Sequence, residues 1–110
     1  MVTTARITAR SRNLRFAFST VPTGNGIEIA TPEMPARSMS VKAVEDAVDA
    51  AARTVSGGTY YNARLWVGEA VVVGFCGCGA QSLSDMRFIL NAARNGGAVV
   101  DVREPVDISS

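Results

Sequence analysis

The chain has 110 residues, of which 47% are hydrophobic and 19% charged, a composition typical of one soluble globular domain with its own core. It has no His, which removes the commonest general base, proton shuttle and neutral metal ligand. No apolar run approaches the roughly 20 residues that cross a bilayer, and the Arg- and Thr-rich N-terminus lacks the apolar segment of a secretory signal. We therefore expect a cytoplasmic protein without a membrane partner.

Positive charge is concentrated at the N-terminus, although the formal net charge of the chain is only +1. Residues 1–27 contain no acid and carry the basic residues Arg6, Arg10, Arg12 and Arg15. Either this segment attracts an anionic partner such as nucleic acid, or its charges keep an edge strand soluble and discourage edge pairing. We expect a flexible or edge-strand arm over residues 1–11, a single α+β domain over 12–103 and a polar tail over 104–110.

The domain begins with the pattern of a β-hairpin. Apolar residues alternate with small or polar ones over residues 14–18, which predicts a strand. Residues 21–26 have turn chemistry, and the alternation over 27–30 predicts a short return strand. Residues 31–40 contain two Pro and no periodicity, so we expect a loop there.

Residues 41–55 carry the clearest helical pattern in the chain. Ser38 or Ser40 is placed to cap the N-terminus of this helix, and Gly57 and Gly58 supply a left-handed stop. The apolar stripe that faces the core consists of Val41, Val44, Val48, Ala51 and Val55.

Residues 60–75 predict a second hairpin that turns near Gly68. Its second strand contains the apolar run 70–75, which is typical of a central strand buried on both faces. A second helix follows, and it ends at residues 95–97, where Asn and two Gly occur. A last strand covers residues 98–102.

The start of the second helix has its own signal. Ser82 or Ser84 is expected to be the N-cap, and Asp85 stands three residues after Ser82, as in a capping box.

The expected order of elements is therefore ββαββαβ. Without one strand of the first hairpin, this order becomes βαββαβ, which is the order of ferredoxin-like domains. We expect an α+β fold in which two helices cover one face of an antiparallel sheet of four to five strands.

Cys76 and Cys78 are separated by one glycine at the expected corner between strand and helix. Two thiolates at this spacing can converge on one metal ion, but a structural zinc site needs four ligands, and the chain offers two Cys and no His. The alternatives are a redox couple or nucleophile near a helix N-terminus, and two reduced cysteines that fill tight space. We expect no bound metal and no cofactor.

The same corner is also a candidate anion site. Backbone amides without bulky side chains precede the helix there, which favours a phosphorylated or nucleotide-like ligand. The segment has neither the Lys of a Walker loop nor the spacing of the dinucleotide fingerprint. The residues of this candidate site are Gly77, Gly79, Gln81 and Ser82.

Strand alternation divides residues 60–67 between two faces of the sheet. Tyr61, Ala63, Leu65 and Val67 are expected beneath the helices, whereas Tyr60, Asn62, Arg64 and Trp66 are expected on an open face. Aromatic and Arg side chains on an open sheet suit single-stranded nucleic acid or a protein interface.

The neighbouring strand favours the protein interface. Its alternation puts Val71, Val73 and Phe75 on one face and Ala70, Val72, Gly74 and Cys76 on the other, and neither set is polar. An apolar face beside Trp66 is better explained by burial against a second copy than by contact with water.

These observations predict a non-enzymatic binding protein, a regulator or inhibitor from a bacterium or phage, that self-associates through its sheet face. A dimer is the first expectation, and the further partner is a protein or an anionic ligand. The first alternative is a nucleic-acid-binding domain that uses the open face and the Arg arm. The second is a thiol-dependent enzyme, or a binder of a small anion, at the Cys76–Gly79 corner.

Overall fold

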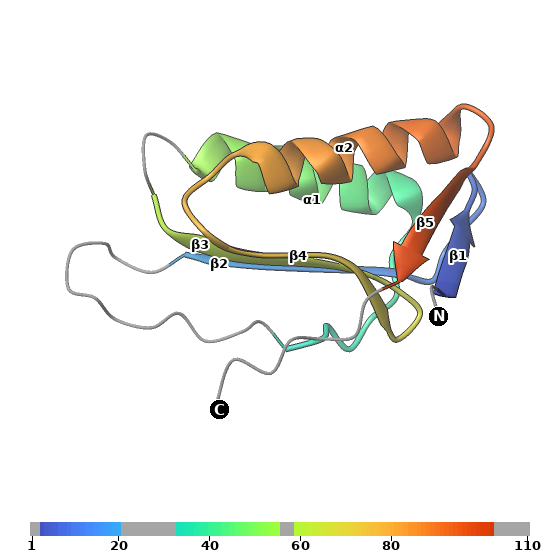
Figure 1. Cartoon of the computed structure of the whole chain (residues 1–110), viewed down its shortest axis with the longest axis horizontal. Coiled ribbons are helices and arrows are strands. Elements are labelled where there is room, and N and C mark those ends of the chain that lie inside the picture. The colour runs from blue at the N-terminus through green and yellow to red at the C-terminus, as the bar shows by residue number, and fades with distance from the viewer. Residues whose placement is uncertain (1–2, 21–32, 56–58, 103–110) are drawn as a thin grey trace.

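The computed structural model of the chain describes residues 3–20, 33–55 and 59–102. The described elements, in chain order, are β1 (Thr3–Ile7), β2 (Leu14–Thr20), α1 (Val41–Thr54), β3 (Tyr61–Val67), β4 (Ala70–Gly77), α2 (Gln81–Arg94) and β5 (Ala98–Val102). The two helices lie side by side over one face of the long strands, and β1 and β5 stand at one end of the molecule (Figure 1). Among the described residues, no helix is both long and apolar enough to cross a membrane.

The described strands form two antiparallel sheets. One has the order β2-β3-β4, and the other pairs β1 with β5. The predicted α+β class and the ββαββαβ order are confirmed, but the prediction of one sheet with four to five strands is wrong. The reason is that β5 pairs with the N-terminal segment Thr3–Ile7 instead of extending the central sheet. The predicted return strand at 27–30 lies outside the described residues.

Helix α1 forms where the apolar stripe and the capping serine predict it. The side chain of Ser40 accepts a hydrogen bond from the backbone amide of Ala43 at 3.2 Å, which satisfies one of the free donors in the first turn. The buried residues of the helix are Val41, Val44, Val48 and Ala51. The predicted glycine stop at residues 57–58 lies outside the described residues.

Helix α2 begins earlier than its serines predict. Its first residue is Gln81, and the N-cap residue Ala80 makes no side-chain hydrogen bond, so the prediction of Ser82 or Ser84 as the cap is wrong. Ser82 lies inside the first turn and is buried. Its hydroxyl lies 2.7 Å from that of Tyr61, so it bonds to this side chain instead of capping a backbone amide.

The end of α2 follows the predicted pattern. Asn95 is the C-cap, and Gly96 and Gly97 follow with φ angles of 136° and 103°. Both angles lie in the region that favours glycine, so the glycines let the chain leave the helix and enter β5.

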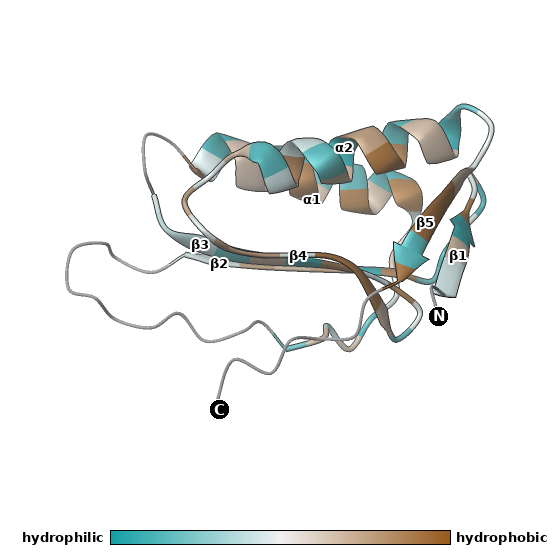
Figure 2. Ribbon diagram, viewed as in Figure 1, coloured by the Kyte–Doolittle hydropathy of each residue, from teal (hydrophilic) through white to brown (hydrophobic). Residues whose placement is uncertain are grey.

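The core lies between the β2-β3-β4 sheet and the two helices, and the sheet of β1 and β5 closes one end. Hydrophobic residues of both helices are directed toward the strands, and hydrophilic residues mark their outer sides (Figure 2). Fully buried side chains come from all these parts: Ile7, Leu14, Val44, Val48, Tyr61, Leu65, Met86 and Leu90.

A β-bulge changes which face the β4 residues occupy. Leu65 is opposite Val73, but its neighbour Trp66 is opposite Val71, so Val72 is an extra residue on β4. Val72 and Val73 both contact the core, whereas Val71 is buried outside it beside Trp66. The prediction that Val71 shares a face with Val73 is therefore wrong, because one inserted residue reverses the alternation.

The hydroxyl of Tyr61 holds the corner between β4 and α2 in place. It donates to the carbonyl oxygen of Gly79, and therefore accepts from the hydroxyl of Ser82. We expect Tyr61→Phe to lower the free energy of unfolding by about 1–3 kcal/mol, because the Ser82 hydroxyl and the Gly79 carbonyl lose their partner. Chemical denaturation measures this loss.

Two variants control this experiment. Tyr60→Phe removes an exposed hydroxyl and is expected to change stability by less than about 0.5 kcal/mol. Adding Ser82→Ala to Tyr61→Phe removes the Ser82 hydroxyl that the first change leaves without a partner. The double variant is therefore expected to lose less free energy of unfolding than the sum of the two single changes. Equal midpoints for wild type and Tyr61→Phe would contradict the anchoring role.

Candidate functional site

The central strand β3 is buried on the sheet face opposite the helices. As predicted, Tyr61, Ala63, Leu65 and Val67 belong to the core beneath the helices. The exposed fractions on the other face are 1% for Asn62, 8% for Arg64 and 3% for Trp66, whereas Tyr60, just before β3, is 38% exposed. The prediction that this face is open is therefore wrong, since both faces of β3 are covered within the monomer.

Arg64 lies opposite a glycine in the neighbouring strand. Its partner in β4 is Gly74, and a Cβ atom at Gly74 would lie 3.8 Å from Cγ of Arg64. Burial lowers the pKa of the Arg64 guanidinium from its ordinary value, because desolvation disfavours the charged form. Arg64 and Asn62 both interact with other groups of the chain. This face therefore does not offer Asn62, Arg64 and Trp66 as a free contact cluster.

The four N-terminal arginines do not share one role. Arg6, Arg10 and Arg12 are exposed, whereas Arg15 is half-buried and its Nη1 donates to the carbonyl oxygen of Pro35. Arg6 on β1 extends toward Gly97, just beyond the C-terminus of α2, where a cation is favourable to the helix dipole. An anionic partner for this arm stays a prediction.

One glycine of the strand-to-helix corner has a structural reason of its own. Gly77 has a φ of 154°, and a Cβ atom there would lie 2.9 Å from Cζ of Phe75, which accounts for this glycine without a ligand. Gly79 accepts a hydrogen bond from Tyr61 through its backbone carbonyl, a contact that any residue could make.

The side chains at the start of α2 are also engaged. Ser82 bonds to Tyr61, and Nε2 of Gln81 donates to Oδ1 of Asp85 at 3.0 Å. The Asp85 carboxylate adds negative charge near the helix start, which disfavours an anion there. Anion binding at this corner stays a prediction, and these contacts do not strengthen it.

Cys76 and Cys78 are both reduced and exposed. Among residues 3–20, 33–55 and 59–102, no three Cys, Asp or Glu side chains gather into a group that could hold a metal ion. The structural feature next to the thiols is Tyr60, whose pKa is raised by a hydrogen bond with Cys76 and by the negative charges of both cysteines. A redox or nucleophilic role of the pair stays a prediction.

A groove runs between β4 and α2 and is closed at one end by β5. It encloses about 460 Å³. Its lining residues, which define the β4–α2 groove, are Val72, Val73, Gly74 and Phe75 from β4, Gln81, Ser82, Asp85, Phe88 and Ile89 from α2, and Val100 and Asp101 from β5. The groove combines an apolar floor with a few polar side chains, a typical composition for a binding site.

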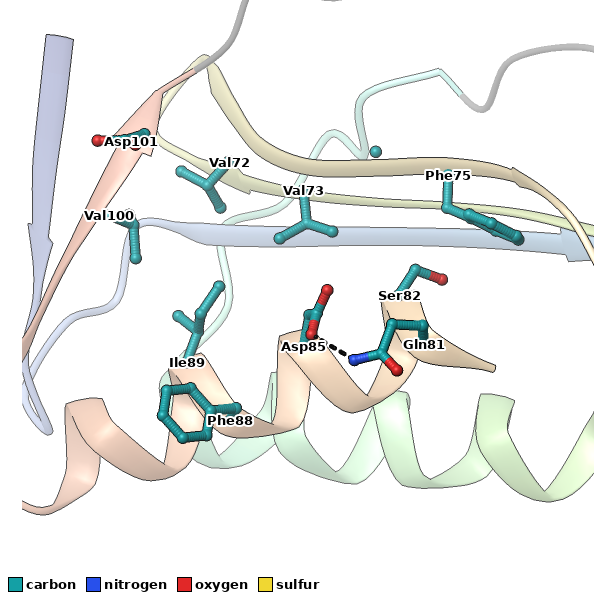
Figure 3. A pocket seen from close by; sticks show the side chains of 11 residues that line it. Val72, Val73, Phe75, Gln81, Ser82, Asp85, Phe88, Ile89, Val100 and Asp101 are labelled. Carbon is teal, nitrogen blue, oxygen red and sulfur yellow. Dashed lines mark hydrogen bonds between the residues drawn. The ribbon is translucent and has the colours of Figure 1, made fainter. Parts of the chain in front are cut away.

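The side chains of the β4–α2 groove converge from its two walls. Val73 and Phe75 extend from β4 toward α2, whereas Asp85 and Ile89 extend from α2 toward β4 (Figure 3). Phe88 lies on the outer side of α2 and is 76% exposed, the largest exposed fraction among the big apolar side chains of the described residues. An exposed aromatic beside an apolar groove is a common feature of interaction sites.

The sequence analysis did not predict this groove. One signal was present, because Phe88 falls outside the buried stripe of α2, which consists of Leu83, Met86, Leu90 and Ala93 with Ser82. An aromatic residue off the buried face of an amphipathic helix is left exposed to solvent or to a partner. The contribution of β5 to the groove could not be inferred from the local pattern.

β4 is an edge strand. It pairs with β3 on one side, and no described strand pairs with its other side. The backbone amide of Gly68, at the end of β3, donates to the carbonyl of Asn13 beside β2 at 2.7 Å. Since peptide groups alternate in direction along a strand, the even-numbered residues of β3 bond toward β2 and the odd-numbered ones toward β4.

The direction of the β4 peptide groups follows from this alternation. The partners of the odd-numbered β3 residues are Val73, Phe75 and Gly77, whose amides and carbonyls are used within the sheet. The peptide groups of Gly74 and Cys76 therefore point away from β3, toward the free edge beside the groove. These two residues present the hydrogen-bonding groups that an added strand requires.

The contact between Tyr60 and Cys76 generates a prediction about pH. Because the Cys76 side chain raises the pKa of Tyr60, Cys76→Ser is expected to lower it toward the ordinary value for tyrosine. Wild-type Tyr60 thus stays protonated to a higher pH than in the variant. Titration of the tyrosine ring signals by NMR separates Tyr60 from Tyr61. Cys78→Ser is the control and is expected to shift the pKa less, and identical curves for all three proteins would contradict the contact.

Comparison of the chain with protein-family models, with curated proteins and with solved structures finds no match.

Proposed function

We propose that this protein is a non-enzymatic binding protein that pairs an extended segment of a partner polypeptide with the free edge of β4. The observation that supports this proposal most is the combination of an unpaired strand edge with an apolar groove directly beside it. The edge supplies backbone hydrogen bonds, and the groove receives alternate side chains of the added strand.

The sequence of β4 supports a strand edge that is used for binding. Edge strands are commonly protected by charged residues or by Pro, which prevent pairing with other chains. β4 has the sequence AVVVGFCG, which contains neither a charged residue nor Pro. A strand of this composition with outward-pointing peptide groups favours the addition of a further strand.

Helix α2 supplies the side-chain contacts in this proposal. A strand added to β4 places every second side chain on the helix side of the sheet. These side chains would enter the groove and contact Val73, Phe75 and Ile89, and Phe88 would cover them from outside. Burial of apolar surface in this way contributes roughly 25 cal/mol per Å².

The proposed site of association is the edge of β4, whereas the sequence predicts association through the sheet face. Self-association through the sheet face requires Trp66 to be accessible, and its side chain is only 3% exposed. The edge of the same sheet, next to the groove, is the surface that the described residues leave available. We place the protein in the cytoplasm, since Cys76 and Cys78 are reduced and exposed, as suits a reducing compartment.

Hydrogen exchange of single amides tests the proposal. In the free protein, the amides of Gly74 and Cys76 are expected to exchange quickly, while those of Val73 and Phe75 are protected by β3. An acetylated and amidated heptapeptide, Thr-Gln-Thr-Val-Thr-Gln-Thr, serves as an extended probe. At saturating concentration it is expected to slow exchange at Gly74 and Cys76.

Position 74 offers a matched pair of variants. Gly74→Pro removes the outward amide and is expected to abolish peptide binding, whereas Gly74→Ala retains the amide. The Ala variant is expected to fold, because its Cβ atom would meet its nearest neighbours at 3.8 Å, an ordinary contact distance. Unchanged exchange at Gly74 and Cys76 with saturating peptide, or equal peptide binding by the Pro and Ala variants, would refute strand addition at this edge.

A further inference from the structure

Both charged side chains in the lining of the β4–α2 groove are acidic. They are Asp85 on α2 and Asp101 on β5, and both are exposed. Among the described residues, no Lys or Arg belongs to the lining. A groove with two carboxylates and an apolar floor selects a partner that is apolar and positively charged at alternate positions.

The basic residues of α2 do not neutralise these carboxylates. Nη2 of Arg87 lies 2.7 Å from Oδ1 of Asp49, and Nε of Arg94 lies 3.3 Å from Oε1 of Glu45 without the alignment of a hydrogen bond. Both acidic partners belong to α1, so these ion pairs hold the cations of α2 on the side of the helix that faces α1. The negative charge of Asp85 and Asp101 is therefore available to a segment bound in the groove.

The remaining neighbours do not change this balance. Asp85 accepts a hydrogen bond from Gln81, a neutral donor that brings no positive charge to the groove. Arg6 on the strand paired with β5 is opposite Val99, and its guanidinium extends to Gly97 instead of Asp101. Among the described residues, no Lys or Arg forms an ion pair with Asp85 or Asp101.

We infer that the β4–α2 groove takes an extended, positively charged peptide segment, in which one apolar side chain lies between two basic ones on the helix side of the added strand. This inference rests on the proposed strand addition at β4. Along the groove, Asp101 lies at the end closed by β5, Ile89 lies between the two carboxylates, and Asp85 lies level with Val73 (Figure 3). Side chains at i and i+4 of the added strand are thus directed to the two carboxylates, and the side chain at i+2 to the apolar floor.

The same charges disfavour a second copy of this chain as the occupant. If two β4 strands paired edge to edge about a two-fold axis, the α2 helices of both copies would approach each other. Each copy would then bring Asp85 toward the partner's acidic groove, and like charges at an interface oppose association. β4 itself carries no basic residue that could offset them.

A series of three heptapeptides tests the inference, measured by NMR titration of the full chain. The probe with the proposed pattern is acetyl-Thr-Lys-Thr-Val-Thr-Lys-Thr-amide, and its two relatives carry Gln or Glu in place of Lys. The Lys peptide is expected to bind about 2- to 30-fold tighter than the Gln peptide, because two exposed ion pairs each contribute modestly. The Glu peptide is expected to bind weakest, and the difference is expected to shrink as salt is added.

Variants of the carboxylates assign the effect to the groove. The double variant Asp85→Asn and Asp101→Asn is expected to bind the Lys and Gln peptides equally, while Gly74 and Cys76 still gain exchange protection. Asp46→Asn is the matched control, because Asp46 is an exposed carboxylate on α1 that pairs with Lys42. It is expected to keep the preference for the Lys peptide.

The outcomes separate the inference from the proposed function. If all three peptides protect Gly74 and Cys76 with equal affinity, the cationic preference is refuted and strand addition stands. If none protects these amides, strand addition itself fails. Light scattering gives the mass of the free chain, and a dimer with Gly74 and Cys76 already protected would show that a second copy occupies the edge, which also refutes the cationic partner.

Discussion

One buried hydroxyl group joins the elements that form the proposed binding surface. Tyr61, fully buried on β3, donates to Gly79 and accepts from Ser82, and its ring centroid lies 5.0 Å from that of Phe75. These contacts join the central strand to the corner that follows β4 and to the first turn of α2. Because the start of α2 is tied in this way, the helix lies along the outer strand with a groove beside it. A satisfied buried hydroxyl thus anchors the end of the groove at which α2 begins.

The burial of β3 on both faces is the reason that we place the proposed binding surface at the edge of the sheet. Gly74 lies opposite Arg64 and directs its own peptide group to the free edge. The bulge at Val72 adds to this arrangement by turning two consecutive valines toward the helices. Apolar side chains are therefore available to the groove at the point where the ladder with β3 is irregular.

The parts of the fold that local pattern determines were predicted from the sequence. The α1 stripe, the Ser40 cap, the hairpin turn at Gly68 and the strand after Gly97 all depend on residues within a few positions of one another. The pairing of β5 with β1 depends on segments at opposite ends of the domain, and the bulge depends on how two strands pack. A single inserted residue was enough to reverse the predicted face of Val71. The prediction of an open face was wrong for a different reason. The alternation of β3 assigns residues to a face of the sheet, but it does not show what covers that face.

The charges around α2 explain how an unprotected edge strand is compatible with a specific interaction. An edge without Pro or charge, such as that of β4, invites pairing with any extended chain, including a second copy. Arg87 and Arg94 are held toward α1 by Asp49 and Glu45, so the carboxylates of Asp85 and Asp101 dominate the open side. In the proposed interaction, these carboxylates would repel the acidic groove of another copy and attract a basic segment. In the proposed function, these two carboxylates would thus protect the edge of β4 from pairing with a second copy and would also select a basic segment.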